Sequence, residues 1–204
     1  MIFVGGYVHG TVIVEFPTLI ALSICYHVKR WAILLSTYNI YLKNMDFHAN
    51  PANFSNIFQE YIIIEKHLRI LKETLSIPLL LCLSCAFVNS YIMLSETLQL
   101  NESFRLLDIC TYSIMDVLFT AGLTIACSMI PENMLKIKTT AGILLDRYQL
   151  YDVIEEKEIH ILKRIEGKNI IYLTAGDVIN IKRSFLLSSS GTLLTYGLLI
   201  YNLG

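Results

Sequence analysis

Two acidic side chains and one histidine lie within long apolar stretches of the sequence: Glu15, Asp116 and His9. Ionisable groups are costly at membrane depth, and they usually face a cavity, a partner side chain or an ion pathway. Tyrosines share these stretches, and a pocket with aromatic walls and a few polar contacts could bind a small ligand. Alternatively, the tyrosines anchor helices at the membrane interface and Asp116 hydrogen-bonds within the bundle. The candidate ligand-binding residues are Tyr7, His9, Tyr91, Tyr112 and Asp116.

The last apolar stretch begins with small hydroxylated residues. Ser188, Thr192, Thr195, Leu199 and Leu203 recur at intervals of three or four residues, so they share one face of a helix. Small polar residues within a membrane either hold helices together or line water. If this face lines water, Leu199 and Leu203 would form an apolar constriction that closes by dewetting. The spacing by itself favours helix packing over a pore.

No set of residues indicates an enzyme. The sequence has no glycine-rich phosphate loop, no His-Glu-x-x-His pair and no nucleophile elbow. Cys82 and Cys85 have the spacing of half a zinc or redox site, but the sequence supplies no second pair and no histidine partner beside them. We interpret the cysteines as small packing residues. We therefore expect no catalytic residue, no metal and no cofactor.

The composition is that of an integral membrane protein. The chain has 204 residues, of which 54% are hydrophobic and 16% charged, and its mean hydropathy is +0.55. A soluble domain is usually about 25% charged, so this chain has too few charges to cover a water-facing surface. Its net charge of −1 offers no basic face for nucleic acid, and we expect the lipid bilayer as its surroundings instead.

Four apolar stretches are long enough to cross a bilayer, since a helix of about 20 residues rises roughly 30 Å. We expect an all-α, polytopic transmembrane bundle that forms a single domain over residues 1–204. The segments between the first and second spans and between the third and fourth, residues 29–74 and 131–183, are expected to be helical and cytoplasmic. The predicted spans are residues 2–26, 75–94, 109–130 and 184–203.

The basic residues predict the orientation of these spans. Fifteen of the sixteen Lys and Arg residues lie in the two long connecting segments, and only Arg105 lies in the short connection 95–108. Lys and Arg favour the cytoplasmic side of short loops, so both termini are expected outside. The short outer loop then carries Asn101-Glu102-Ser103, a glycosylation pattern on the side where glycans are added.

The connecting segments have helical periodicity. Residues 54–75 are expected to form a cytosolic helix that runs without a break into the second span, with Pro78 close to the junction. Residues 139–164 are expected to form an amphipathic helix, and Gly167 marks a break before Ile170. Such helices need an apolar partner in water, which a bundle beneath the membrane or a subunit interface would supply.

The end of the sequence resembles a family signature. Thr195-Tyr196, five mainly apolar residues and then Asn202-Leu203 are similar to the closing signature of arthropod gustatory receptors, which reads Thr-Tyr, five hydrophobic residues, Gln, Phe. Residues 173–187 resemble the lead-in to the last helix of that family. Two positions depart from the signature, since Asn202 replaces Gln and Leu203 replaces Phe. The family has seven spans, so the four spans here are expected to be a C-terminal fragment.

The resemblance implies a fold, a function and an assembly. It implies a homo- or hetero-tetrameric chemosensory receptor in the plasma membrane that acts as a ligand-gated, non-selective cation channel and responds to a small-molecule tastant. The last helix would line the central pore, and the cytoplasmic helices would hold the subunits together. The residues that the resemblance places in the pore and gate are Ser188, Thr192, Thr195, Leu199, Asn202 and Leu203.

Two other classes of membrane protein are also considered for this sequence. A fragment of a G-protein-coupled receptor would place a cytoplasmic tail after its last span, whereas the charge distribution predicts that this chain ends outside. A transporter subunit would use Glu15 and Asp116 to carry ions across the membrane.

Overall fold

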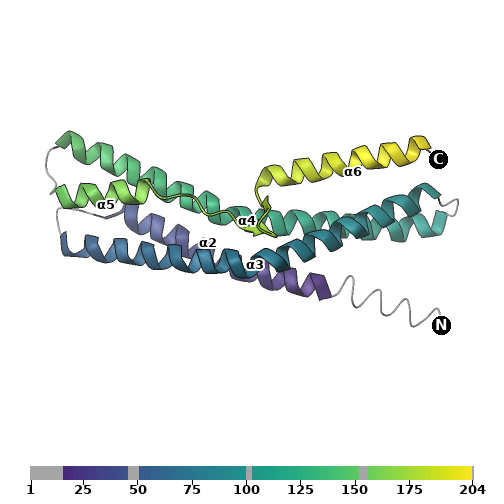
Figure 1. Cartoon of the computed structure of the whole chain (residues 1–204), viewed down its shortest axis with the longest axis horizontal. Helices are drawn as coiled ribbons and strands as arrows, with labels where there is room; N and C mark the ends of the chain where they lie inside the picture. Colours follow the sequence, from purple (N-terminus) through teal and green to yellow (C-terminus); the bar gives the residue numbers. More distant parts are fainter. Residues whose placement is uncertain (1–15, 46–50, 100–102, 152–155, 204) are drawn as a thin grey trace. The chain divides into compact units, whose positions relative to one another are not determined.

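The computed structural model covers the 204-residue chain and describes residues 16–45, 51–99, 103–151 and 156–203 (Figure 1). Helices make up most of the described chain, which confirms the all-α class. The described part holds five helices and a small antiparallel sheet. These elements are α2 (Phe16–Lys43), α3 (Pro51–Gln99), α4 (Ser103–Tyr151), α5 (Glu156–Glu166), β1 (Thr174–Ala175), β2 (Ile179–Asn180) and α6 (Arg183–Leu203).

Buried side chains recur every three or four residues along the long helices. This spacing places them on one face of an α-helix, which packs against the neighbouring helices. In α2 the pattern runs through Ala21, Ile24, Val28, Ala32, Leu35, Tyr38 and Leu42.

Three helical segments of the described chain are long and apolar enough to cross a membrane: Phe16–Lys43, Asn56–Ile92 and Ile114–Arg147. Large hydrophobic side chains lie on parts of their outward faces as well as on their buried ones. Large hydrophobic side chains such as Leu19 and Leu118 are exposed, and surfaces of this kind usually meet lipid or another protein. The fold is therefore compatible with a membrane protein. The fourth predicted span, 184–203, is helical as α6, and its crossing of a membrane stays a prediction.

The helices extend well beyond the predicted spans. The predicted cytosolic helix 54–75 does run unbroken into the second span, because both lie within α3, which contains Pro78. The short outer connection predicted over 95–108 is helical over most of its length, since α3 continues to Gln99 and α4 begins at Ser103. Its position outside the membrane stays a prediction. The glycosylation residue Asn101 lies outside the described residues.

Two predictions for the second connecting segment need correction. The amphipathic helix expected over 139–164 is divided between α4, which ends at Tyr151, and α5, which begins at Glu156. The break at Gly167 is confirmed, but the helical segment predicted over 131–183 does not continue beyond it. Residues 168–182 form an extended chain with the β1–β2 hairpin, in which Thr174 pairs with Asn180 and Ala175 with Ile179.

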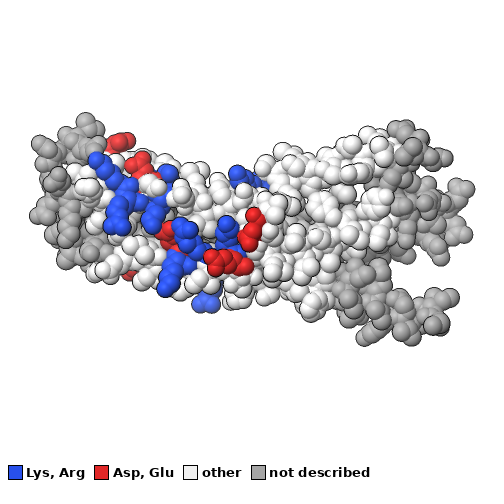
Figure 2. Space-filling view, viewed as in Figure 1, with Lys and Arg blue, Asp and Glu red and all other residues white. Residues whose placement is uncertain are grey.

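The chain divides into two compact units. Unit 1 comprises Met1–Tyr26, Leu75–Ser128 and Leu173–Gly204, and unit 2 comprises His27–Thr74 and Met129–Tyr172. Within the described chain, unit 1 therefore holds the start of α2, the later part of α3, the earlier part of α4, the hairpin and α6. Charged side chains gather over the α5 end of the face drawn in Figure 2, whereas α6 carries no charge over residues 184–199 and its surface is white.

Unit 2 is held together by a mixed apolar and polar core. Its fully buried side chains include Leu35 of α2, Leu68 of α3 and Leu162 of α5. The amide of Asn133 donates a hydrogen bond of 2.9 Å to the carbonyl of Ala32, which ties α4 to α2 through two buried groups. A buried amide that finds a partner adds directional specificity to an otherwise apolar contact.

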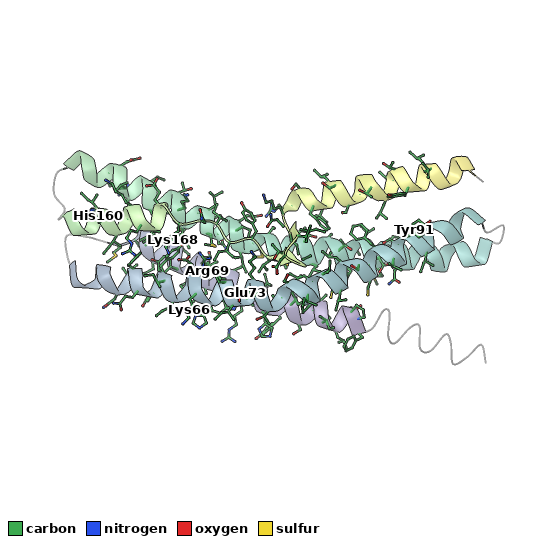
Figure 3. The ribbon with its side chains drawn as sticks, in the orientation of Figure 1. Lys66, Arg69, Glu73, Tyr91, His160 and Lys168 are labelled. Carbon is green, nitrogen blue, oxygen red and sulfur yellow. The ribbon has the colours of Figure 1, made fainter. Side chains whose placement is uncertain are left out.

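An almost buried carboxylate joins α3 to the chain after α5. The Glu65 side chain is 6% exposed, and its Oε1 accepts hydrogen bonds from Nε and Nη2 of Arg69 at 3.2 and 2.7 Å. Its Oε2 lies 2.7 Å from Nζ of Lys168. Figure 3 labels Arg69 and Lys168. Both carboxylate oxygens thus have a cationic donor, which a charge in so dry a place requires. Lys168 lies just beyond Gly167, so the contact fixes the start of the extended segment.

In unit 1 the hairpin is docked on α3 through a single serine. The N–H of Gly176 donates to the carbonyl of Ser76 at 2.9 Å, and the N–H of Asp177 donates to the Ser76 hydroxyl at 2.8 Å. Gly176 and Asp177 both have positive φ, +60° and +57°, and Asp177 also accepts a hydrogen bond of 3.0 Å from the Thr174 hydroxyl. Asp tolerates this conformation better than most residues when its side chain is bonded locally. The turn is therefore held at two backbone N–H groups by Ser76.

Candidate functional site

Unit 1 contains a cavity of about 440 Å³ formed by the beginning of α2, the later part of α3 and the early part of α4. Its wall is largely apolar, with an aromatic ring, two thiols and a few hydrogen-bonding side chains. A concave site with this balance of apolar and polar groups is the usual form of a small-molecule pocket. The described lining residues are Pro17, Thr18, Cys82, Cys85, Ala86, Asn89, Met115, Asp116, Leu118 and Phe119.

The cavity exists because three helices present small and medium side chains at the same level. Ala86 and Cys82 are one helical turn apart on α3, and both are buried. The thiol of Cys82 points at the carbonyl of Pro17 on α2, with 3.8 Å between sulfur and oxygen. Asp116 projects from the facing helix α4, half-buried in the same wall. Among the described residues of the wall, a single carboxylate thus lies beside apolar and weakly polar groups.

The predicted ligand-binding set is only partly brought together. Asp116 lines the cavity. Tyr91 lies on α3, 50% exposed, and is not among the described residues that line the cavity (Figure 3). Tyr7 and His9 lie outside the described residues, as does the side chain of Tyr112. Glu15, the other acidic residue singled out in the sequence, also lies outside them.

The helix α6 has three distinct faces. The first packs on α3 and α4: Ser189 is buried, and the ring of Phe185 lies edge-on to that of Phe87, with 6.2 Å between centroids. This face also borders a second cavity of about 210 Å³ in unit 1. The second face is exposed and leucine-rich, and it includes Leu187, Leu194 and Leu198. The third is the predicted pore face.

The described part of the predicted pore face is exposed. The hydroxyls of Ser188, Thr192 and Thr195 donate back to the carbonyls four residues earlier, at 3.3, 2.9 and 2.8 Å. Leu199 continues the same face and is 53% exposed. Helix packing within unit 1, which the spacing favoured, therefore uses Ser189 rather than this stripe. The side chains of Asn202 and Leu203 lie outside the described residues.

The sequence reasoning missed most of the cavity wall. Asn89 is buried in α3 and lines the cavity, yet side-chain amides in the first three predicted spans do not enter the sequence analysis. Counting side-chain amides in apolar stretches as well would have found it. Cys82 and Cys127 are buried among apolar neighbours, as expected for packing residues, and the four described cysteines are free thiols. Phe119 and Met115 had no distinguishing signal, because apolar residues in a span are ordinary.

The arrangement combines a small cavity carrying one carboxylate with an exposed hydroxylated face on the last helix. No protein-family model matches the chain, and no curated protein does.

Proposed function

We propose that the chain is a subunit of a chemosensory receptor that acts as a ligand-gated, non-selective cation channel in the plasma membrane. The observation that carries the proposal is the division of α6 into a packed face, a leucine-rich face and an exposed hydroxylated face. A helix that only met lipid would not need hydroxyl groups along one exposed face. A helix between lipid, its own subunit and water would have three such faces.

The hydroxylated face supports a pore that narrows toward its end. Ser188, Thr192 and Thr195 would be wetted, and Leu199 would begin the apolar constriction. The hydroxyl protons are bonded to the helix backbone, so their oxygens remain free to accept hydrogen bonds from water. Copies of α6 from a homo- or hetero-tetramer would enclose this path. The resemblance of Thr195-Tyr196 and Asn202 to the gustatory receptor signature supports the same assembly.

The cavity of unit 1 supports the ligand-binding part of the proposal. It is of a size that suits a small tastant, and it borders α4 at Asp116, a position in the predicted outer half of the third span. A ligand that bound there would change the packing among α2, α3 and α4. If α6 moved together with those helices, a gate at Leu199 would open or close.

The test of the proposal is ligand-evoked current. The chain is expressed in oocytes, alone and within the longer coding sequence that the resemblance predicts, and delivery to the surface is measured by biotinylation. Cation currents that are evoked by small tastants and that reverse near 0 mV are expected. Surface-delivered protein that conducts nothing in response to a broad tastant panel would overturn the proposal.

The Leu199→Ala variant is expected to raise the resting current severalfold. A smaller apolar side chain widens the constriction and weakens its dewetting, so the closed pore leaks. The matched control is Leu194→Ala, which makes the same change on the leucine-rich face, where the side chain is 69% exposed against 53% for Leu199. Equal resting currents in both variants at equal surface amounts would contradict a gate at Leu199.

The predicted orientation, with the connection 95–108 and the end of the chain outside the cell, is tested separately. Glycan addition at Asn101 is expected to slow migration of the chain on a gel, and the shift should vanish after endoglycosidase treatment or in Asn101→Gln. A tag placed after Gly204 is expected to bind antibody in intact, unpermeabilised cells. A tag that is reached only after permeabilisation would place the end of the chain in the cytosol and favour a G-protein-coupled receptor fragment.

A further inference from the structure

We propose that the cavity of unit 1 binds a small organic cation, whose ammonium group pairs with Asp116 while its apolar body fills the rest of the cavity. This inference names the ligand class of the site described above and rests on the proposed function only for the step from binding to gating. It follows from three properties of the wall: its charge, its number of oxygen ligands and its apolar surface.

The charge of the wall is unbalanced. Asp116 is the one carboxylate among the described lining residues, and none of these residues is Lys, Arg or His. Arg105, on the same helix, is eleven residues earlier, which is roughly 16 Å along an α-helix. A carboxylate in an apolar, half-buried place is stabilised strongly by a cation that enters with it. A ligand ammonium would supply that cation, whereas an acidic ligand would be repelled.

The described side chains of the wall supply few oxygen atoms for an inorganic cation. Calcium takes six to eight oxygen ligands, and magnesium takes six. Side-chain oxygens in the described wall come only from Thr18, Asn89 and Asp116. No group of three or more metal-ligating side chains occurs in the part of the chain that the structure describes. An ammonium group needs only one to three acceptors, so it fits this donor set better.

The remaining surface fits a compact apolar body. Phe119 offers an aromatic ring, and Met115 and Cys85 offer polarisable sulfur in the same wall. Rings attract cations at their faces and sulfur at their edges. A sugar would place four or five hydroxyl groups against a wall with three strongly hydrogen-bonding side chains, and hydroxyls left without partners would oppose binding. The cavity therefore favours an amine with a hydrocarbon or aromatic body over a polyol.

The direct test compares three probes of one shape: 2-phenylethylamine, 2-phenylethanol and 3-phenylpropanoate. Binding to the purified chain in lipid nanodiscs is measured by titration calorimetry at neutral pH, where a primary alkylamine is charged. The amine is expected to bind at least about tenfold more tightly than the alcohol, and the acid is expected not to bind. Equal affinities for the amine and the alcohol, or no binding by the amine, would overturn the proposal.

Two substitutions test whether the Asp116 carboxylate binds the ammonium group of the ligand. Asp116→Asn is expected to lower the affinity for the amine about tenfold and to leave that for the alcohol nearly unchanged. Asp116→Glu, which keeps the carboxylate, is expected to retain most of the amine affinity. Asp146→Asn, an exposed acidic residue of unit 2, is the control and should bind as the wild type does. Circular dichroism of each variant establishes that it is folded, and an amine affinity unchanged in folded Asp116→Asn would contradict the assignment.

The wild-type chain offers a second readout, which needs no substitution. Cys85 lines the cavity, and Cys25 is similarly half-buried but is not among the described lining residues. Saturating 2-phenylethylamine is expected to slow alkylation of Cys85 by N-ethylmaleimide severalfold, measured by peptide mass spectrometry, and to leave Cys25 unchanged. Protection of both thiols alike, or of neither, would count against binding in this cavity.

The results separate this inference from the proposed function. Charge-dependent binding of the amine without any current from surface-delivered protein would overturn the channel and support the amine site. A current evoked by uncharged tastants, together with no binding of the amine by the purified chain, would support the channel and overturn the amine site.

Discussion

The Gly176→Val substitution is expected to lower the free energy of unfolding of the chain by about 2–4 kcal/mol. Gly176 has φ +60°, and a Cβ atom built there would lie 2.9 Å from Cδ2 of Leu80 on α3. A β-branched residue strongly disfavours this backbone conformation, which accounts for most of the cost. The exposed Leu80 side chain can move aside, whereas the backbone strain is relieved only if the turn changes its conformation. The measurement is the thermal unfolding midpoint of the purified chain in detergent.

Two other glycines provide matched controls for this substitution. Gly122 in α4 and Gly191 in α6 have no atom within 4 Å of the place where a Cβ would lie. Alanine at either position is therefore expected to be neutral, or to stabilise its helix by about 0.5–1 kcal/mol. Gly176→Ala should fall between Gly176→Val and these controls. An unfolding midpoint for Gly176→Val within one degree of the wild type would show that the hairpin contact with α3 contributes little.

The Lys168→Met variant is expected to destabilise the chain by about 1–3 kcal/mol. The ammonium of Lys168 lies 2.7 Å from Oε2 of Glu65, and the Glu65 side chain is only 6% exposed. Removal of the ammonium leaves that oxygen without its cationic donor in a place that water barely reaches. Arg69 continues to bond the other oxygen, which limits the loss. Chemical unfolding in urea and mild detergent measures the change.

A double-mutant cycle isolates the pair from other effects of losing a lysine. Glu65→Gln, Lys168→Met and the double variant are expected to give a coupling energy of about 1–2 kcal/mol. Lys66→Met removes an exposed lysine one residue from Glu65 and is expected to change stability by less than about 0.5 kcal/mol (Figure 3). Additive effects of the two single substitutions would mean that the ion pair contributes nothing beyond each side chain's own packing.

The helices were largely predictable from the sequence, because periodicity and apolar length are local properties. The range predicted for the last span, 184–203, agrees closely with α6, and the continuity of α3 across the predicted membrane boundary followed from unbroken helical spacing. The ends of the helices were less predictable. α4 runs from Ser103 to Tyr151 because neither the polar residues before Ile109 nor Pro131 interrupts it.

The hairpin and the cavity depend on contacts between residues far apart in sequence. Nothing local marks Ser76 as the anchor of a turn one hundred residues later, and the apolar run 170–181 is equally compatible with a helix. Asp116 could be identified because a charge in a span is rare. Its neighbours Asn89 and Phe119 could not, because their roles arise only when α3 and α4 pack together.

The attachment of the hairpin to Ser76 has a mechanical consequence. Ser76 lies two residues before Pro78, where α3 lacks one backbone hydrogen bond and bends most easily. The turn that Ser76 holds leads through β2 and Lys182 directly into α6. A bend of α3 at this place is therefore expected to move the hairpin and, with it, the first turn of α6. The amide protons of Gly176 and Asp177 report on this movement. Their exchange with deuterium is expected to become faster only when their hydrogen bonds to Ser76 break.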